Sequence, residues 1–421
     1  MKTVYKFLMF GAMALALTVV NVTASFAQDD AAAQEAKTAL YTKFTDCYTK
    51  RKNLPPADLD ACYAVGKDYL DKYEKDNDQY SQFVRKVYDA YVKVKAADAL
   101  ANRFNNSVKD SKAINADEAF SSGKEFIDQN PDAVDVPIVL ASIGFDNASA
   151  ATPNDKYNAD AINYAKMTID RINAGKVSPN GQYGAYQYAY KTTKYPDGKN
   201  NALGWMNYTI GYIMFYRQNQ KKDALPYLYK ATQINSETKN NFRIYATIGS
   251  WYADEFKRID ADRIAKVKAA SDQDTEETKS LYALQKGYAE RAADTYARAA
   301  KLASTDTSAT KEQKDGLLTL AKQFYGIRYN NDPTKFDGFD TYYAGLTNKP
   351  LVDPTTAVTP VVEQTPAATT PGAATTSTPV TTATPSTTTT AKPTPPTPST
   401  TTTTTTKPST TSTPPKKKGT R

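Results

Sequence analysis

Few residues in this chain of 421 have the types and spacing that catalysis requires. It contains no histidine and only two cysteines, Cys47 and Cys62. A Ser-His-Asp or Cys-His arrangement, a His-Cys zinc site and a histidine general base are therefore excluded. Adjacent carboxylates such as Asp254 and Glu255 point in different directions on a helix, so they do not form an acid–base pair. We expect a protein that is not an enzyme and that uses no cofactor or metal.

The two cysteines suit a disulfide bond. Residues 53–58 (Asn-Leu-Pro-Pro-Ala-Asp) predict a turn between two antiparallel helices. The midpoint between Cys47 and Cys62 falls inside this turn, so the two side chains would lie level across the hairpin. In an exported protein they would also meet an oxidising environment. We predict a Cys47–Cys62 disulfide, with two buried free thiols as the alternative.

Aromatic residues are the strongest candidates for a binding surface in a chain with 30 tyrosines. One set recurs at helical spacing: Trp205, Tyr208, Tyr212, Phe215 and Tyr216. A second set lies on what we interpret as the preceding helix: Tyr183, Tyr186 and Tyr190. Tyrosine and tryptophan offer a partner a large rigid face with a polar tip. The alternative is that they fill the core between helices.

Residues 1–27 predict an export signal. A short basic start precedes an apolar run over 7–17, and Ser25-Phe26-Ala27 offers small residues at the two positions that a signal peptidase reads. We expect cleavage after Ala27 and an exported protein, in the periplasm, at the cell surface or outside the cell. A retained membrane anchor is the alternative. No later segment is apolar enough to span a bilayer, so we expect no transmembrane segment after cleavage.

Residues 351–421 predict a disordered Thr/Pro-rich tail. They contain no aromatic residue, and 29 of the 71 are threonine and 13 proline. Such a chain buries too little apolar surface to offset its ordering entropy. An O-glycosylated stalk and an unmodified spacer both fit this composition. The basic end, residues 416–421, fits either a plain solubilising end or a contact with anionic cell-wall polymers or glycans.

The net charge of +8 does not indicate nucleic-acid binding, because it is concentrated at the two ends. Residues 1–27 carry +2 and residues 351–421 carry +4, which leaves +2 for residues 28–350. A near-neutral body of mixed charge is not a phosphate-binding surface. We therefore expect no nucleic-acid partner.

The body of the chain predicts helices throughout. Residues 30–345 show apolar positions at three- and four-residue spacing, broken by Pro, Asn, Asp and Gly. One motif repeats: Gly-Lys-Asp-Tyr-Leu-Asp at 66–71 returns as Gly-Lys-Glu-Phe-Ile-Asp at 123–128. Small residues at such spacing let one helix lie close against its neighbour. An ordinary helical bundle with chance similarity is the alternative.

A helix–turn–helix pattern is clearest over residues 207–234. It consists of Ile210-Gly211 and Met214, followed by Ala224, Leu228 and Ala231. In this pattern the chain resembles tetratricopeptide repeats, which stack helix pairs into a superhelix. The resemblance implies an all-α, tetratricopeptide-like solenoid of antiparallel helix pairs over residues 28–350, followed by the disordered tail. It also implies a concave groove lined by first-helix residues, on or near which the set from Trp205 to Tyr216 would lie.

An insertion interrupts the pattern after Ile248-Gly249. Residues 254–303 are charged and helix-prone, with a turn near 271–275, and predict two long helices in an extended hairpin. We expect three side chains of the first helix to face the second: Ile259, Ile264 and Val267. A short cap is expected near residues 340–343.

Two functions follow from these observations. The first is a non-catalytic exported scaffold that binds a protein or peptide in the concave groove. The second is a glycan or cell-wall binding module of the envelope, in which tyrosines stack on sugar rings.

Overall fold

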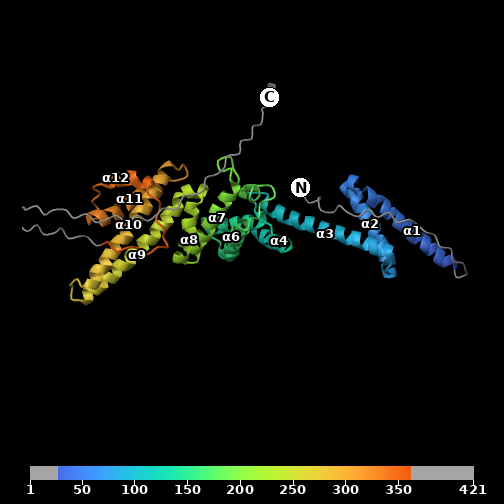
Figure 1. Ribbon diagram of the computed structural model, residues 1–421, viewed down its shortest axis with the longest axis horizontal. Coiled ribbons are helices and arrows are strands. Elements are labelled where there is room, and N and C mark those ends of the chain that lie inside the picture. The colour runs from blue at the N-terminus through green and yellow to red at the C-terminus, as the bar shows by residue number, and fades with distance from the viewer. Residues whose placement is uncertain (1–26, 362–421) are drawn as a thin grey trace, which may run out of the picture. The chain divides into compact units, whose positions relative to one another are not determined.

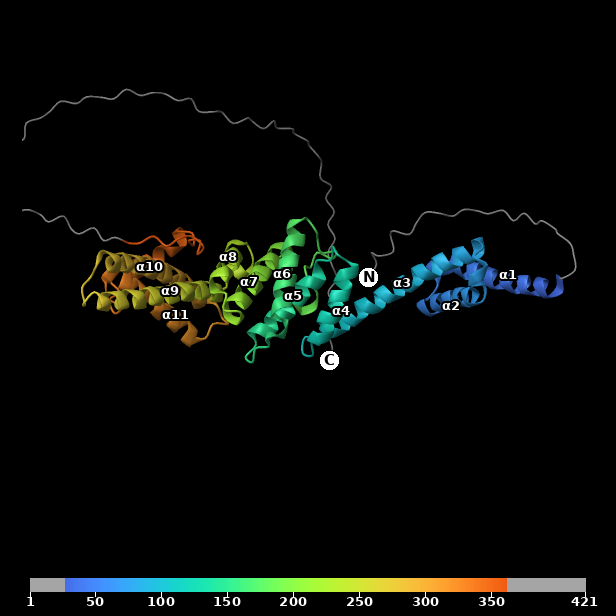
Figure 2. The same ribbon diagram turned by 90° about the horizontal axis from the view of Figure 1, so that it is seen from below.

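The computed structural model describes residues 27–361 (Figures 1 and 2). The predicted signal peptide up to residue 26, and the tail beyond residue 361, lie outside the described residues. Within them the chain forms helices and no strand, which confirms the all-α fold class. The α-helices are α1 (Ala27–Lys50), α2 (Pro56–Tyr73), α3 (Gln79–Val108), α4 (Ala116–Gln129), α5 (Asp135–Ser149), α6 (Asn158–Asn173), α7 (Gly198–Tyr212), α8 (Lys221–Gln233), α9 (Phe242–Ala269), α10 (Glu276–Thr305), α11 (Lys311–Tyr325) and α12 (Phe339–Gly345).

From α1 to α11 each helix packs against the next one along the chain, and α5 also packs against α7. Short connections make sequential neighbours of this kind, as in arrays of helix pairs. Glycines set the closest approaches. A Cβ atom at Gly144 of α5 would lie 2.3 Å from Ala161 Cβ on α6, and one at Gly211 of α7 would lie 2.7 Å from Leu228 on α8. In both pairs the contacting residue comes 17 positions after the glycine, so the two pairs repeat one packing geometry.

The predicted long hairpin forms α9 and α10, which have 28 and 30 residues. Ile259 is 2% exposed and faces the core as expected, but Ile264 is 56% exposed, so its expected contact across the hairpin is wrong. Near Ile264, Lys266 of α9 forms an ion pair with Glu277 of α10, and Arg263 of α9 forms one with Asp274 in the turn between the two helices. The predicted cap is α12, which has seven residues.

The first three helices have a core of their own. Phe44, Tyr69 and Val84 are fully buried in it, one from each helix. The predicted disulfide joins Cys47 of α1 to Cys62 of α2, with the Cα atoms 5.7 Å apart. That prediction is confirmed, and with it the turn between the two helices.

Helix α3 belongs to two cores. Its first half contributes Val84 to the first core, and its second half contributes Phe104 and Val108 to the core shared with α4 and α5. Between these halves, residues 92–99 are exposed. Alanine occupies three of the last four of these positions, and it is the residue that best sustains a helix without packing.

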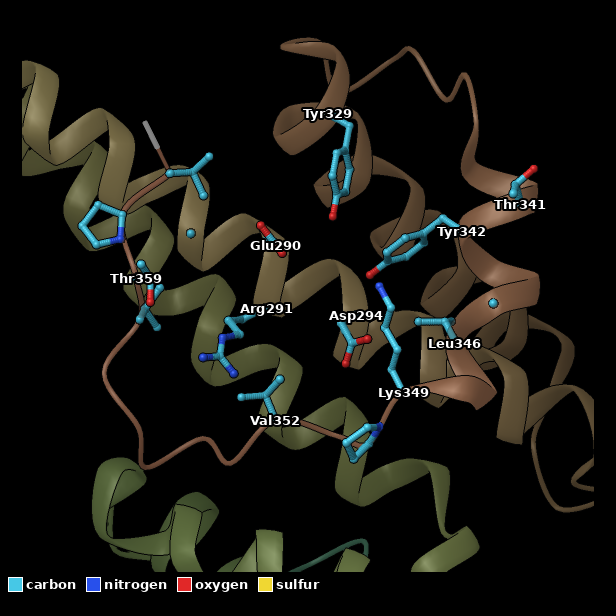
Figure 3. Close-up of a pocket in the computed structure, with 16 residues that line it drawn as sticks. Glu290, Arg291, Asp294, Tyr329, Thr341, Tyr342, Leu346, Lys349, Val352 and Thr359 are labelled. Carbon is cyan, nitrogen blue, oxygen red and sulfur yellow. The ribbon is translucent and has the colours of Figure 1, made fainter. Parts of the chain in front are cut away.

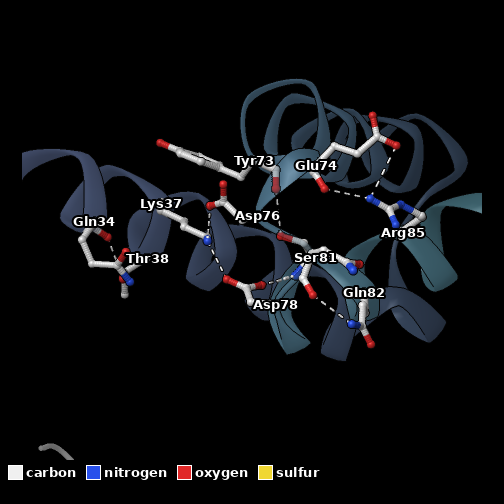
Figure 4. Close-up of polar contacts among 11 residues, drawn as sticks. Gln34, Lys37, Thr38, Tyr73, Glu74, Asp76, Asp78, Ser81, Gln82 and Arg85 are labelled. Carbon is white, nitrogen blue, oxygen red and sulfur yellow. Dashed lines mark hydrogen bonds and ion pairs between the residues drawn. The ribbon is translucent and has the colours of Figure 1, made fainter. Parts of the chain in front are cut away.

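A buried lysine joins α1 to the start of α3 (Figure 4). Lys37 is only 7% exposed, and its ammonium group bonds to the carboxylates of Asp76 and Asp78. Asp78 also caps α3 by accepting a hydrogen bond of 2.8 Å from the Ser81 N–H. Burial alone would raise the pKa of Asp78, but the bonds from Lys37 and Ser81 outweigh it and lower that pKa.

The first testable prediction concerns this charge. Because the folded pKa of Asp78 is depressed, its stabilisation is present above the unfolded value of about 3.9 and is lost as pH falls through the folded pKa. Asp78→Asn keeps a capping side chain but removes the charge. We expect it to lower the free energy of unfolding by about 1 kcal/mol at pH 7, since the site is partly screened by solvent. Urea titrations at pH 7 and pH 2 measure the effect, and a difference that persists at pH 2 contradicts the assignment.

The second prediction concerns the disulfide. The bond closes a loop with a sequence separation of 15, which in the chain-entropy model stabilises the folded state by about 3 kcal/mol. We expect a thiol reductant to lower the melting temperature of the first core. Reduction breaks the bond without any substitution, so the effect reports on the disulfide alone. Thiol labelling of the denatured, unreduced protein should find no free cysteine. An unchanged melting curve after verified reduction counts against the stabilising role.

Candidate functional site

The aromatic set expected on or near the concave groove, from Trp205 to Tyr216, lies on α7 and the π-helical turn Ile213–Arg217 that follows it. Tyr208 and Phe215 are buried, at 4% and 3% exposure, which agrees with the alternative that these rings fill the core between helices. Trp205 and Tyr212 are partly buried, and Tyr216 is 48% exposed. The helical spacing does place them in a row, but most of that row is covered.

The residue that covers the row is Phe145 of α5. Its ring centre lies 5.4 Å from that of Tyr208 and 5.2 Å from that of Tyr212, and it also packs edge-on against Trp205. The polar tips are used internally as well. Trp205 Nε1 donates to Glu237 at 3.0 Å, and the Tyr216 hydroxyl lies 2.9 Å from Thr247 Oγ1. Burial raises the pKa of Tyr208, as expected for a phenol inside a core. The set therefore packs α7 against its neighbours.

The second aromatic set does not lie on a helix, which corrects the sequence-based interpretation. Residues 174–197 are mostly irregular, with one short 3-10 turn, Tyr186–Tyr188. Tyr183 and Tyr186 have φ angles of 52° and 54°, a left-handed conformation that breaks helical periodicity.

Two carboxylates of α5, Asp135 and Asp146, hold this irregular segment in place. Asp135 accepts a hydrogen bond of 2.9 Å from the Gly184 N–H, and Asp146 accepts one of 2.7 Å from the Tyr188 hydroxyl. Burial raises the pKa of both carboxyl groups. The sequence around Asp135 and Asp146 gives no sign of these roles, because a single carboxylate on an apolar helix does not reveal its distant partner.

The third prediction tests the burial of the aromatic row. Tyr208→Ala removes a buried ring and should lower the free energy of unfolding by about 3–5 kcal/mol. Tyr216→Ala, the matched change eight residues further along the chain, removes a half-exposed ring and one hydrogen bond, and should cost about 1 kcal/mol. Thermal and urea denaturation compare the two proteins. Equal stability losses would contradict the burial pattern.

A different surface has the features of a binding site. Residues 351–361, hereafter the strap, run in a non-helical path over α10. The expectation that the tail begins at residue 351 is therefore wrong for these eleven residues, since Leu351 is only 7% exposed and Pro354 is buried. The Val361 N–H donates to the Ala283 carbonyl at 2.8 Å. The strap is thus held by both side chains and main chain.

Arg298 of α10 fixes the chain where it enters the strap. Its Nη2 atom donates to the carbonyl oxygens of Lys349 and Pro350, at 2.8 and 3.3 Å. Asp294, one turn earlier, orients the guanidinium by accepting a hydrogen bond of 2.8 Å from the Arg298 Nε–H. Contacts to carbonyl oxygens do not depend on the side chains of the bound segment.

A cleft of about 740 Å³ lies beside the strap (Figure 3). Its floor is α10, with Glu290 and Arg291, and Tyr329 and Tyr342 point their hydroxyls into it from the opposite wall. Glu290 is paired with Arg328 at 2.8 Å, so its charge is balanced. Burial, and then the charge of Glu290, raise the pKa of Tyr329 to about 12.

One polar group in the cleft is unsatisfied. Arg291 Nη1 is buried, and within the described residues no atom accepts a hydrogen bond from it. A buried donor of this kind costs free energy unless it is paired. In Figure 3 the Arg291 side chain points toward the strap, near Val352 and Thr359.

No protein-family model, curated protein or solved structure matches the chain. The helix pairs are compatible with a helical repeat. Among residues 27–361, no cluster of three or more His, Cys, Asp or Glu side chains is placed to hold a metal ion. In the same stretch, none of the helices combines the length and the apolar character needed to cross a membrane.

Proposed function

We propose that the protein is an exported, non-catalytic scaffold whose helical surface binds an extended peptide segment of a partner protein. The observation that carries this proposal is the strap. The surface of α10 already holds a non-helical, proline-containing chain segment, through buried anchors and through hydrogen bonds to its main chain. Extended binding surfaces are the usual use of helical repeat arrays, and the tetratricopeptide resemblance agrees with this use.

Export is supported by two independent features. Residues 1–27 have the order of charged, apolar and small residues that a secretory signal requires. Cys47 and Cys62 form a disulfide, which persists in oxidising compartments outside the cytoplasm. The proposed location is the periplasm or the cell surface.

The structure favours a peptide over a sugar as the ligand. Stacking on a sugar ring needs an accessible aromatic face, and of the predicted set Tyr216 is the one that is about half exposed. The cleft at α10 instead combines charged groups such as Glu290 and Arg291 with aliphatic side chains and two tyrosines around a bound chain segment, a mixture that suits a peptide.

The fourth prediction tests the proposed surface. The photoreactive residue p-benzoylphenylalanine replaces Thr341, which is exposed and lines the cleft, or Tyr186, which is 48% exposed and lies outside it. Each mature protein is irradiated with solubilised envelope proteins and, separately, with insoluble cell wall. We expect protease-sensitive adducts with discrete envelope proteins from position 341 and not from position 186. Adducts with cell wall alone, or equal protein adducts from both positions, contradict the proposal.

A further inference from the structure

We propose that the strap is an intramolecular ligand that occupies a peptide-binding site on α10, and that the site takes extended, proline-containing segments of the same chemistry from a partner protein. This inference rests on the proposed function and names both its ligand class and its regulation. The strap must leave α10 before a partner segment can bind.

The burial pattern of the strap defines the ligand. Its least exposed positions are Leu351, Pro354, Val358 and Val361, at intervals of three or four residues. The residues between them are exposed, apart from the partly buried Asp353, which forms a turn by accepting a hydrogen bond of 2.9 Å from the Thr355 N–H. The site therefore selects a segment that presents three aliphatic side chains and a proline at this spacing, with a single acidic group.

Gly287 is the position on α10 that admits the strap backbone. A Cβ atom there would lie 2.4 Å from the Thr359 carbonyl oxygen and 2.8 Å from Val358. Such distances are well inside van der Waals contact, so any larger residue forces the bound segment away. Glycine is an unfavourable residue in a helix interior, yet here it serves the contact between α10 and the strap.

Within the described part of the chain, the strap fills only part of the site and leaves one hydrogen-bond donor of the site without an acceptor. The cleft of about 740 Å³ stays open beside it, and Arg291 Nη1 remains without an acceptor in the described residues. Val352 is 44% exposed although it lines the cleft. A partner segment with a carbonyl or hydroxyl oxygen near Arg291 would add the missing hydrogen bond and displace the strap, despite the high effective concentration of a tethered ligand.

The experiment uses the full mature chain and a fluorescent synthetic peptide with the sequence of residues 349–363. In an open-strap variant, Leu351→Ser removes a buried anchor and Val361→Pro removes the N–H that bonds to Ala283. Because a site occupied in cis has a reduced apparent affinity, we expect the open-strap variant to bind the peptide about tenfold or more tightly than wild type. Fluorescence anisotropy measures both dissociation constants.

A pair of matched substitutions locates the binding. Gly287→Ala, added to the open-strap variant, should abolish this gain, because its Cβ collides with the bound segment. Gly316→Ala on α11 is the control, since a Cβ at that helical position meets no atom within 4 Å. It should leave peptide binding unchanged.

Circular dichroism first verifies that each variant is folded. If the double variant is not, Val361→Pro alone replaces it, because it leaves the buried Leu351 anchor in place. A folded open-strap variant that binds no more tightly than wild type overturns the inference, as does tight binding that survives Gly287→Ala. Either result leaves the proposed function standing if cross-linking from position 341 still captures envelope proteins, so the two failures are distinguishable.

Discussion

Close packing between paired helices is the constraint on which the rest of the structure depends. At Gly144 and Gly211 the absence of a side chain lets the partner helix approach until its Cβ or leucine side chain occupies the missing position. That contact decides which face of each helix is buried within its pair and which face meets the next pair. The aromatic row on α7 lies on the second kind of face. Its rings therefore complete the core between pairs.

A second close approach involves α10 and the strap. On α10 the atoms nearest to a Cβ at Gly287 belong to Val358 and Thr359 of the strap, so the chain itself returns over this position. A main-chain segment can lie this close to a helix only where a glycine leaves room for it. The absence of a glycine side chain, which lets helices pack closely within the array, thus also lets a non-helical segment bind at α10.

Much of this fold could be predicted from local patterns. The turn at residues 53–58, the disulfide and the long α9–α10 hairpin all depend on spacing along one or two neighbouring helices, which the sequence displays directly. The cover over Tyr208 depends on Phe145, 63 residues earlier, and no local pattern connects the two. The left-handed backbone at Tyr183 and Tyr186 likewise depends on tertiary contacts. The strap did leave a signal: five of the six aliphatic Leu or Val residues after position 350 fall within residues 351–362, which sets this stretch apart from the rest of the tail.

The exposed stretch of α3 has a consequence for how the chain tolerates change. Residues 96–99 are held in a helix by their own backbone hydrogen bonds, because all four side chains are exposed. Within residues 27–361, the core around Phe44 and the core around Phe104 share no buried residue, so substitutions in one should disturb the other little. Mutational effects on the two sides of these residues should add independently. The disulfide-linked hairpin can therefore accumulate substitutions independently of the rest of the array, to which one turn of alanine-rich helix joins it.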